Sequence, residues 1–274
     1  MKTGHDDRSA NRLPGSNPLF PLDSMPPLPG VGFFLTTRRH GYSQGGYAGL
    51  NLADHVGDDP ATVMRNRHHL MAVLGMADAR LCLLRQVHGV EVRDPANTPP
   101  GAIAPEGDAL VTDRPGLVLG ILVADCAPLL FADVAARVIG AAHAGWRGAI
   151  AGVVPATLQA MVTRGARREQ ITTIIGPCIG REVFVVGPEV RERFLQESAR
   201  YQDHFVEARE TGRFLLDLPG FLRRQLVDNG LVSDRIHHAH ACTFSREELF
   251  FSHRRATLRG GEPCGRQMGG IYLA

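Results

Sequence analysis

An uninterrupted apolar run constrains the fold of this chain more than any other segment does. Leu117 to Ala124 reads LVLGILVA and ends at Asp125. The run is far shorter than the roughly 20 residues that a membrane-spanning helix needs. A short apolar run that ends at a polar residue is typical of a strand buried on both faces. The sequence therefore predicts a sheet inside a well-covered core.

Shorter patterns predict further strands and helices around this strand. Asp59 and Pro60 are typical of the cap and first turn of a helix, which Gly75 ends. Helices and strands do not alternate strictly, which favours an α+β fold with a mixed β-sheet and flanking helices over a doubly wound parallel sheet. The other predicted strands cover residues 32–37, 81–87, 107–112, 138–142, 171–175 and 236–242, and the other predicted helices cover residues 149–164, 188–199 and 219–229.

The chain reads as one domain behind a leader. No internal repeat and no linker interrupts it after residue 30, so we expect a single domain over residues 31–274. Residues 1–30 are rich in proline and lack the continuous apolar region of a signal peptide. They predict a disordered leader.

Charge and cysteine usage exclude several classes of protein. The chain has 30 basic and 28 acidic side chains, a net charge of +2, and its basic residues form pairs rather than runs. This balance argues against a nucleic acid or an anionic membrane as partner. The five cysteines include no CxxC pair. Such usage is typical of a reducing compartment, where thiols pack, bind metal or react, so we expect a cytoplasmic protein.

Three apolar runs end at a residue that can bind a metal ion. His88 follows LLRQV, Cys126 follows LVLGILVAD, and His143 follows VIGAA. Strand ends of one sheet can meet, and two nitrogen ligands with one sulfur ligand suit zinc or copper. Three protein ligands leave a coordination position for water or substrate, as catalytic zinc sites require. Taken singly, each residue is also typical of a packed thiol or a hydrogen-bonded structural histidine.

The turn after His143 has features of an anion site. Gly145 and Gly148 flank Trp146 and Arg147 at a strand-to-helix turn. Free backbone N–H groups at such a turn, together with the guanidinium, can bind an anion. The same pattern is equally typical of a tight packing turn.

A series of motifs runs in order along roughly residues 32–272. They are Thr37-Arg38, His55-Val56-Gly57-Asp58, Gln86-Val87-His88-Gly89, Gly107-Asp108-Ala109-Leu110, Ala124-Asp125-Cys126, Ala142-His143-Ala144-Gly145-Trp146-Arg147-Gly148, Gly176-Pro177-Cys178-Ile179, Cys242-Thr243 and Phe251-Ser252-His253-Arg254-Arg255. Together these motifs resemble the YfiH-like laccase-domain family, and the combination is highly specific.

The resemblance implies a single α+β domain of the fold shared with the cytotoxic-necrotizing-factor cysteine hydrolases. The family was first described as a copper polyphenol oxidase. It was later described as a zinc-dependent enzyme that phosphorolyses adenosine, inosine, guanosine and methylthioadenosine and can deaminate adenosine. Carried onto this chain, its metal ligands fall on His88, Cys126 and His143, and its early Thr-Arg motif falls on Thr37 and Arg38. The expected partners are thus a purine nucleoside and phosphate.

Phosphorolysis needs a cation for phosphate and help for the departing base. Arg38 is the first cationic candidate and Arg147 the second, while Asp125 is the nearest carboxylate for proton transfer. Asp125 is equally suited to orienting a metal ligand. The other candidate contacts of phosphate or substrate are Gly145, Trp146, Arg147 and Cys178. Trp146 either stacks on the purine or caps its turn, and Cys178 either lies in a turn near the site or packs in the core.

Two other enzyme classes remain open. A copper oxidase needs many histidines at paired spacings; this chain has 12 histidines but no HxH series, and we interpret His238 and His240, which alternate with Cys242, as ordinary strand residues. Copper is still an alternative occupant of the three-ligand site, because it binds such ligands more tightly than zinc does. A thiol hydrolase would instead use Cys126 as nucleophile and His143 as base. The oligomeric state is open between a monomer and a homodimer.

Overall fold

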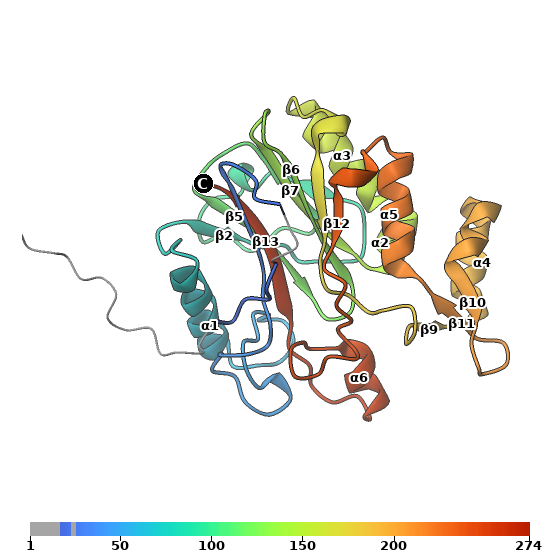
Figure 1. Ribbon diagram of the computed structural model, residues 1–274. Coiled ribbons are helices and arrows are strands. Elements are labelled where there is room, and N and C mark those ends of the chain that lie inside the picture. Colours follow the sequence, from blue (N-terminus) through green and yellow to red (C-terminus); the bar gives the residue numbers. More distant parts are fainter. Residues whose placement is uncertain (1–16, 23–25) are drawn as a thin grey trace, which may run out of the picture.

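The computed structural model describes residues 17–22 and 26–274. Two stacked sheets lie between helices, as Figure 1 shows. The predicted α+β domain with mixed sheets and flanking helices is confirmed. The helices are α1 (Pro60–Val73), α2 (Trp146–Ala151), α3 (Val153–Thr163), α4 (Pro188–Glu197), α5 (Leu218–Asp228) and α6 (His253–Leu258).

The strands of the described residues form three sheets. They are β1 (Val31–Leu35), β2 (Arg80–Cys82), β3 (Val92–Arg93), β4 (Ala109–Thr112), β5 (Leu117–Val123), β6 (Ala127–Asp133), β7 (Val138–Ala144), β8 (Thr172–Ile175), β9 (Val185–Val186), β10 (Phe205–Glu207), β11 (Phe214–Leu216), β12 (Ile236–His238) and β13 (Gln267–Leu273). One sheet has the order β12-β8-β6-β7-β4-β3, a second β1-β13-β5-β2, and a small third β10-β11-β9. The two larger sheets contain parallel and antiparallel pairs.

The apolar run at residues 117–124 is β5, which is buried on both faces as predicted. Val118 and Leu122 pack with Leu70 of α1 on one face. Leu119 and Ile121 point the other way and pack against the six-stranded sheet. Because side chains alternate along a strand, an all-apolar sequence is what such a double-sided position requires.

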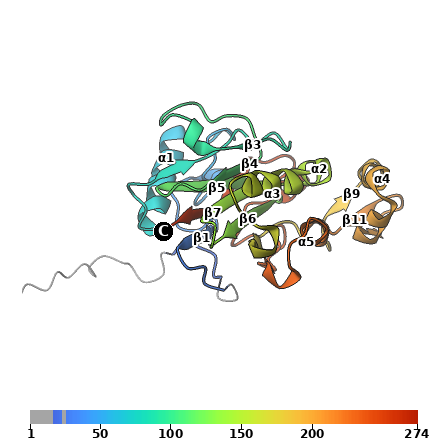
Figure 2. The same ribbon diagram turned by 90° about the horizontal axis from the view of Figure 1, so that it is seen from above.

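Helices cover the outer face of the six-stranded sheet. The core on this side joins α2, α3 and α5 to β6 and β7. Beyond α5, the small sheet and α4 form an arm on the side of the molecule away from α1, which both Figure 1 and Figure 2 show. The sequence predicted α4 but not the small sheet, because its strands are only two or three residues long.

Several element bounds differ from the predictions. The helix predicted at residues 149–164 is divided into α2 and α3 by Gly152, whose φ of +104° is a left-handed conformation that favours glycine. β6 was not predicted, and the strand expected over residues 81–87 ends at Cys82. The strand expected over residues 236–242 ends at His238. In contrast, Asp59 caps α1 as predicted, accepting hydrogen bonds from the N–H groups of Ala61 and Thr62.

Part of the predicted leader packs on the domain. The N–H of Phe20 donates to the carbonyl of Leu35 at 2.7 Å, and the N–H of Thr37 donates to the carbonyl of Pro18 at 2.7 Å. The predicted disorder therefore does not extend over these residues, while residues 1–16 and 23–25 lie outside the described part of the chain. Among the described residues, no helix is both long and apolar enough to cross a membrane.

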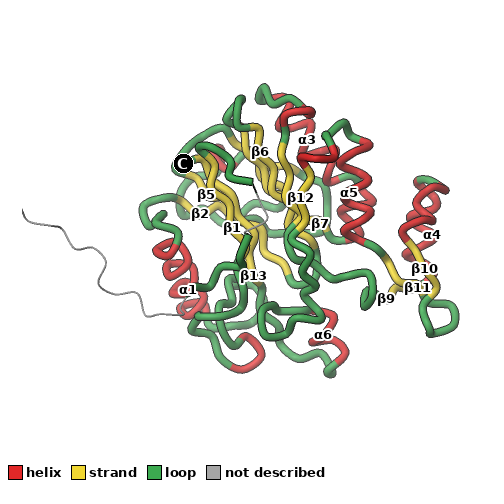
Figure 3. The backbone as a smooth tube through the Cα atoms, in the orientation of Figure 1, coloured by secondary structure: helices red, strands yellow, loops and turns green. Residues whose placement is uncertain are grey.

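The motifs found in the sequence lie along one border of the six-stranded sheet, where several strands start or end. There β6 starts beside the end of β7, with Pro128 opposite His143, and β4 starts opposite Ala142. β8 and β12 also end at this edge, where His238 lies opposite Ile175. We call this border the ligand edge. Loops continue from these strand ends, and Figure 3 shows α6 among the loops next to the start of β13.

Candidate metal centre

The three predicted metal ligands meet at the ligand edge. One ligand atom each from His88, Cys126 and His143 lies within 4.8 Å of the other two. The Sγ of Cys126 is 3.8 Å from Nε2 of His88, and the two imidazole rings lie edge to face with centroids 4.7 Å apart. His88 is exposed and His143 is buried, so the cluster is open to solvent on one side.

The chain turns sharply to place Cys126. Asp125, the residue between β5 and Cys126, has a φ of +95°, which is rare for a side chain other than glycine. Its carboxylate accepts hydrogen bonds from the hydroxyls of Thr243 (2.7 Å) and Ser252 (3.0 Å) and from the N–H of Arg254 (2.6 Å). These contacts hold the strained turn and attach the start of α6 to it, so Asp125 positions the Cys126 segment.

Asp108 holds the two histidine ligands together. This fully buried carboxylate precedes β4, and its Oδ1 lies 2.8 Å from Nδ1 of His143. The same carboxylate accepts from the backbone N–H groups of Val87 (3.2 Å), His88 (2.9 Å) and Gly89 (2.7 Å). The loop that carries His88, itself at a φ of +60°, is thereby fixed to the strand that precedes the other ligands. With Nδ1 of His143 bonded to Asp108, Nε2 is the ring nitrogen that faces Cys126.

The cluster stabilises a charged cysteine. Burial raises the pKa of Cys126, but the charge of His143 and hydrogen bonds from His143 and His88 outweigh it, and the pKa falls to about 6. Burial lowers the pKa of His143, but the Cys126 thiolate and Asp108 outweigh this and raise it to about 9. Burial likewise raises the pKa of Asp108, while hydrogen bonds from His143 and Gly89 bring it below its ordinary value. The thiolate that a metal needs is therefore favoured at this position.

The donor set fits zinc. Two imidazole nitrogens and one thiolate are ligands that zinc prefers, and three protein ligands are typical of catalytic zinc sites. A carboxylate bonded to the second nitrogen of a ligating histidine is a common feature of zinc sites, and Asp108 supplies it to His143. The same donors also suit copper. The residues present thus fit a metal ion at this centre.

Glycine is required where the next helix approaches the cluster. A Cβ on Gly145 would lie 2.7 Å from Sγ of Cys126 and 3.0 Å from the ring of His88. A Cβ on Gly148 would lie 3.0 Å from the carbonyl oxygen of Gly89. The turn predicted from these glycines is therefore packed tightly against the metal ligands.

Trp146 and Arg147 follow this turn at the start of α2. Trp146 is half-buried and packs against the core, and the guanidinium carbon of Arg147 lies 4.3 Å from the centre of the indole ring. Arg147 is exposed. The indole is thus partly covered by its neighbour.

Arg38 lies in a separate cavity. That cavity has a volume of about 190 Å³ and is also lined by Arg255, Arg259 and Glu247, but by none of the three metal ligands. Arg38 stacks on Phe251 at 4.5 Å and donates from Nε and Nη2 to the carbonyl of Ala48. Burial, and after it the charge of Arg255, lower its pKa.

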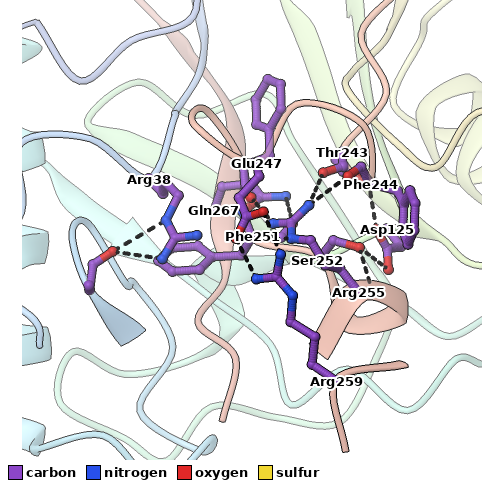
Figure 4. A network of polar contacts seen from close by, with 12 residues as sticks. Arg38, Asp125, Thr243, Phe244, Glu247, Phe251, Ser252, Arg255, Arg259 and Gln267 are labelled. Atoms are coloured by element: carbon purple, nitrogen blue, oxygen red, sulfur yellow. Dashed lines mark hydrogen bonds and ion pairs between the residues drawn. The ribbon is translucent and has the colours of Figure 1, made fainter. Parts of the chain in front are cut away.

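The two arginines beside Arg38 have different hydrogen-bond partners. Figure 4 shows Arg255 bonded to backbone carbonyls and Arg259 paired with Glu247. Ser252, which bonds to Asp125, also lines this cavity. The Arg38 cavity is therefore connected through one hydrogen bond to the turn that carries Cys126.

Cys178 is a buried thiol next to this turn. It pairs with Cys242 in an isolated parallel bridge, and the N–H of Ile179 donates to the carbonyl of Asp125 at 2.9 Å. Burial, and after it the charge of Cys242, raise the pKa of Cys178. All five cysteines are free thiols in this structure.

The residue that sequence reasoning did not single out is Asp108. It stood in a quoted motif, Gly107-Asp108-Ala109-Leu110, without a role. Its hydrogen-bond partners are distant in the sequence: His88 is 20 residues away and His143 is 35 residues away. The available signal was an acidic residue directly before the apolar residues Ala109 to Val111, a strand that is fully buried in this fold.

Comparison with known proteins shows the family of this chain. The family profile described as "Multi-copper polyphenol oxidoreductase laccase" matches residues 32–274. A purine nucleoside phosphorylase of Deinococcus radiodurans is 44% identical over 241 residues, which cover 87% of this chain and 88% of that protein. Adenosine deaminase RL5 from an unknown prokaryotic organism is 34% identical over 258 residues, covering 92% of this chain and 97% of that protein.

A solved structure shares the fold as well. YlmD from Geobacillus stearothermophilus superimposes with a TM-score of 0.81 at 32% sequence identity, covering 91% of this chain and 94% of that one. The resemblance carried by the sequence motifs is thereby confirmed. The chain belongs to the multi-copper polyphenol oxidoreductase laccase family, the YfiH-like laccase-domain proteins.

Proposed function

We propose that this protein is a zinc-dependent purine nucleoside phosphorylase. The observation that carries the proposal is the three-ligand centre of His88, Cys126 and His143, which is open to solvent on the side of His88. The proposed substrates are adenosine, inosine, guanosine and methylthioadenosine, with phosphate as the second substrate. Deamination of adenosine is the proposed secondary activity. Support comes from relatives named purine nucleoside phosphorylase and adenosine deaminase.

A zinc ion bound here would supply Lewis acidity to an oxygen atom of substrate or water. The chain's own residues hold the geometry: Asp108 fixes the ring of His143, and hydrogen bonds to the Asp125 carboxylate hold the turn before Cys126. These contacts favour the orienting role for Asp125 over proton transfer, because its carboxylate already accepts three hydrogen bonds.

Phosphate binding is proposed for Arg38. Its Nη1 has no hydrogen-bond partner among residues 17–22 and 26–274, and Arg255 adds positive charge around the same cavity, where Arg259 is paired with Glu247. A guanidinium is well suited to phosphate because its donors form a planar fork. Gly145, Trp146 and Arg147 are further proposed contacts of phosphate or substrate, on the turn that packs against Cys126 and His88. Cys178 is buried, which favours its role as a packing thiol beside the site over the predicted contact with substrate.

Product chromatography with metal analysis tests the proposal. The protein is incubated with inosine and adenosine, with and without phosphate, and zinc is quantified per chain. We expect phosphate-dependent release of hypoxanthine and adenine at one zinc per chain. His88→Ala, Cys126→Ala and His143→Ala should each remove both zinc and turnover. Phosphorolysis that persists in a metal-free triple variant would refute the site.

A thiol hydrolase is the second candidate. The observation in its favour is that Cys126, His143 and Asp108 form a chain of nucleophile, base and orienting carboxylate, the arrangement that cysteine hydrolases use. Alkylation of Cys126 distinguishes the metal-dependent function from the hydrolase function. If Cys126 of the protein as purified reacts slowly with iodoacetamide and becomes reactive after chelation, the metal function is supported. Rapid alkylation before chelation supports the hydrolase.

Copper is proposed as an alternative occupant of the same three ligands, since the family description names a copper oxidoreductase. Phenol oxidation should remain below phosphate-dependent base release in the zinc-loaded protein, because zinc has no redox chemistry. We further propose a cytoplasmic location and either a monomer or a homodimer; sedimentation of the purified protein distinguishes the two.

A further inference from the structure

A second, larger cavity lies farther along the ligand edge. It has a volume of about 690 Å³ and lies between α5 and the ends of β8 and β12. Its walls include Ile175, Asp217, His238, His240 and Cys242, whereas His88, Cys126, His143 and Arg38 do not line it. Cavities of this size are typical of small-molecule sites.

The position of this cavity suits a ligand that also reaches the metal centre. β8 and β12 are parallel neighbours, and ligands of sheets with parallel strands bind beyond the carboxyl ends of those strands. Only β8 separates β12 from β6, the strand that starts beside Cys126. Neighbouring strands are about 4.8 Å apart, so β12 lies roughly 10 Å from β6, a span that a nucleoside covers.

Two histidines give the cavity its hydrogen-bonding capacity. Neither His238 nor His240 makes a side-chain hydrogen bond within residues 17–22 and 26–274, and their ring centroids are 4.3 Å apart. Burial, and after it the neighbouring His240, lower the pKa of His238 to about 4. Its ring is therefore neutral at physiological pH, with one N–H donor and one acceptor nitrogen.

The remaining lining favours a neutral planar ligand over an anion. Arg223 donates to the carbonyls of Ile236 and Ser233, so its charge is directed to the backbone. Arg181 and Glu182 carry opposite charges in the same cavity. Apolar side chains of Ile175, Ile236 and Pro219 also line the cavity and can contact the face of a ring.

We propose that this cavity binds the purine base of the nucleoside, with His238 and His240 hydrogen-bonded to the heteroatoms of the base and the ribose directed toward the metal centre. The proposal rests on the proposed function and adds the recognition of the base to it. A neutral imidazole donates to the 6-oxo group of hypoxanthine in one tautomer and accepts from the 6-amino group of adenine in the other. The cavity thus accommodates both kinds of purine.

Binding of free bases to the zinc-loaded full chain tests the proposal. His238→Phe keeps a ring of similar size but removes both nitrogens. His240→Asn removes the second imidazole at an exposed position, and asparagine tolerates the φ of +47° found there. His237→Phe is the matched control, because His237 is the adjacent residue of β12 and does not line the cavity.

Calorimetric titration with hypoxanthine and adenine gives the readout. We expect the Kd of both bases to rise at least tenfold in His238→Phe and several-fold in His240→Asn. In His237→Phe the Kd should remain within twofold of that of the unmodified chain. Thermal unfolding identifies any variant that fails to fold, and the exposed His240→Asn then carries the test. An unmodified chain that fails to bind hypoxanthine at millimolar concentration overturns the proposal.

Kinetics with inosine separates this proposal from the function on which it rests. If hypoxanthine binds through His238 but inosine is not phosphorolysed, the function is wrong and the base site stands. If inosine is phosphorolysed with the same KM by the unmodified chain and by folded His238→Phe, the base site is wrong and the function stands.

Discussion

Asp108 and His143 are joined by a hydrogen bond between two buried side chains, with Oδ1 of the carboxylate 2.8 Å from Nδ1 of the ring. The same Oδ1 accepts from the backbone N–H of His88. One carboxylate therefore sets the orientation of one candidate metal ligand and the backbone position of a second. The chain's own hydrogen bonds therefore hold both histidines in place.

Replacing Asp108 by asparagine tests this arrangement. Asparagine offers one acceptor oxygen where four donors meet, so we expect zinc affinity to fall about 10–100-fold, as for other residues that orient a histidine ligand. Unfolding should also become easier by about 1–3 kcal/mol, because buried N–H groups lose a partner. Zinc competition with a chromogenic chelator and thermal unfolding measure the two effects. Asp113→Asn, at an exposed position after β4, is the control and should change neither.

The reactivity of Cys126 should depend on pH in a distinctive way. Its pKa is lowered to about 6, so in metal-free protein the thiolate forms as the pH rises through 6 and is nearly complete at pH 7.5. Alkylation by iodoacetamide should therefore rise between pH 5 and 7 and then level off, whereas an ordinary thiol continues to rise beyond pH 8. Mass spectrometry of the modified peptide gives the rate.

His143→Ala and zinc provide the controls for that profile. Removing the imidazolium should move the midpoint of alkylation to higher pH, and saturating zinc should suppress the fast reaction. A rate at Cys126 that keeps rising up to pH 9 in the unmodified metal-free chain would contradict the lowered pKa.

Some parts of this fold follow directly from the residues. The apolar run of β5 requires burial on both faces, and Asp59 with Pro60 marks the start of α1 through local chemistry alone. β6 did not follow, because Pro128 within it lacks an N–H and normally argues against a central strand. Here Pro128 is the second residue of β6, at the ligand edge, where its carbonyl accepts from Gly176.

The candidate site also has residues that the sequence predicts and residues that it does not. The convergence of His88, Cys126 and His143 was predicted correctly, because each follows an apolar run. The predicted route, strand ends of one sheet, was wrong: His143 lies within β7 of the six-stranded sheet, Cys126 lies after β5 of the four-stranded sheet, and His88 lies in a loop after β2. Asp108 acquires its role only through the register that sets Ala109 opposite Ala142, which a single sequence does not reveal. Of the two histidines interpreted as ordinary strand residues, His238 is the last residue of β12 as predicted, whereas His240 lies beyond the strand in a left-handed conformation.

Replacing Arg38 should raise the KM for phosphate more than the KM for the nucleoside. Removing a guanidinium that bonds an anion costs about 1.5–3 kcal/mol, so Arg38→Ala should raise the KM for phosphate roughly 10–100-fold while zinc content stays unchanged. Arg38→Lys should recover part of the loss, because it restores the charge without the planar fork. Initial rates with inosine at varied phosphate measure this. Arg39→Ala, next in the chain but exposed, is the control; an equal effect in both variants would argue against a specific role of Arg38.

Gly145 should be intolerant of even a methyl group. A Cβ there would lie 2.7 Å from Sγ of Cys126, so Gly145→Ala must displace either the thiolate or the turn before α2. Gly89→Ala is the matched control, because its Cβ would meet Asp108 and Val87 at ordinary contact distances of 3.5 and 3.6 Å. We expect zinc affinity to fall at least tenfold in Gly145→Ala and less than threefold in Gly89→Ala, with both chains folded by circular dichroism. Equal zinc affinity in the two variants would mean that the close approach of this turn does not set the geometry of the metal ligands.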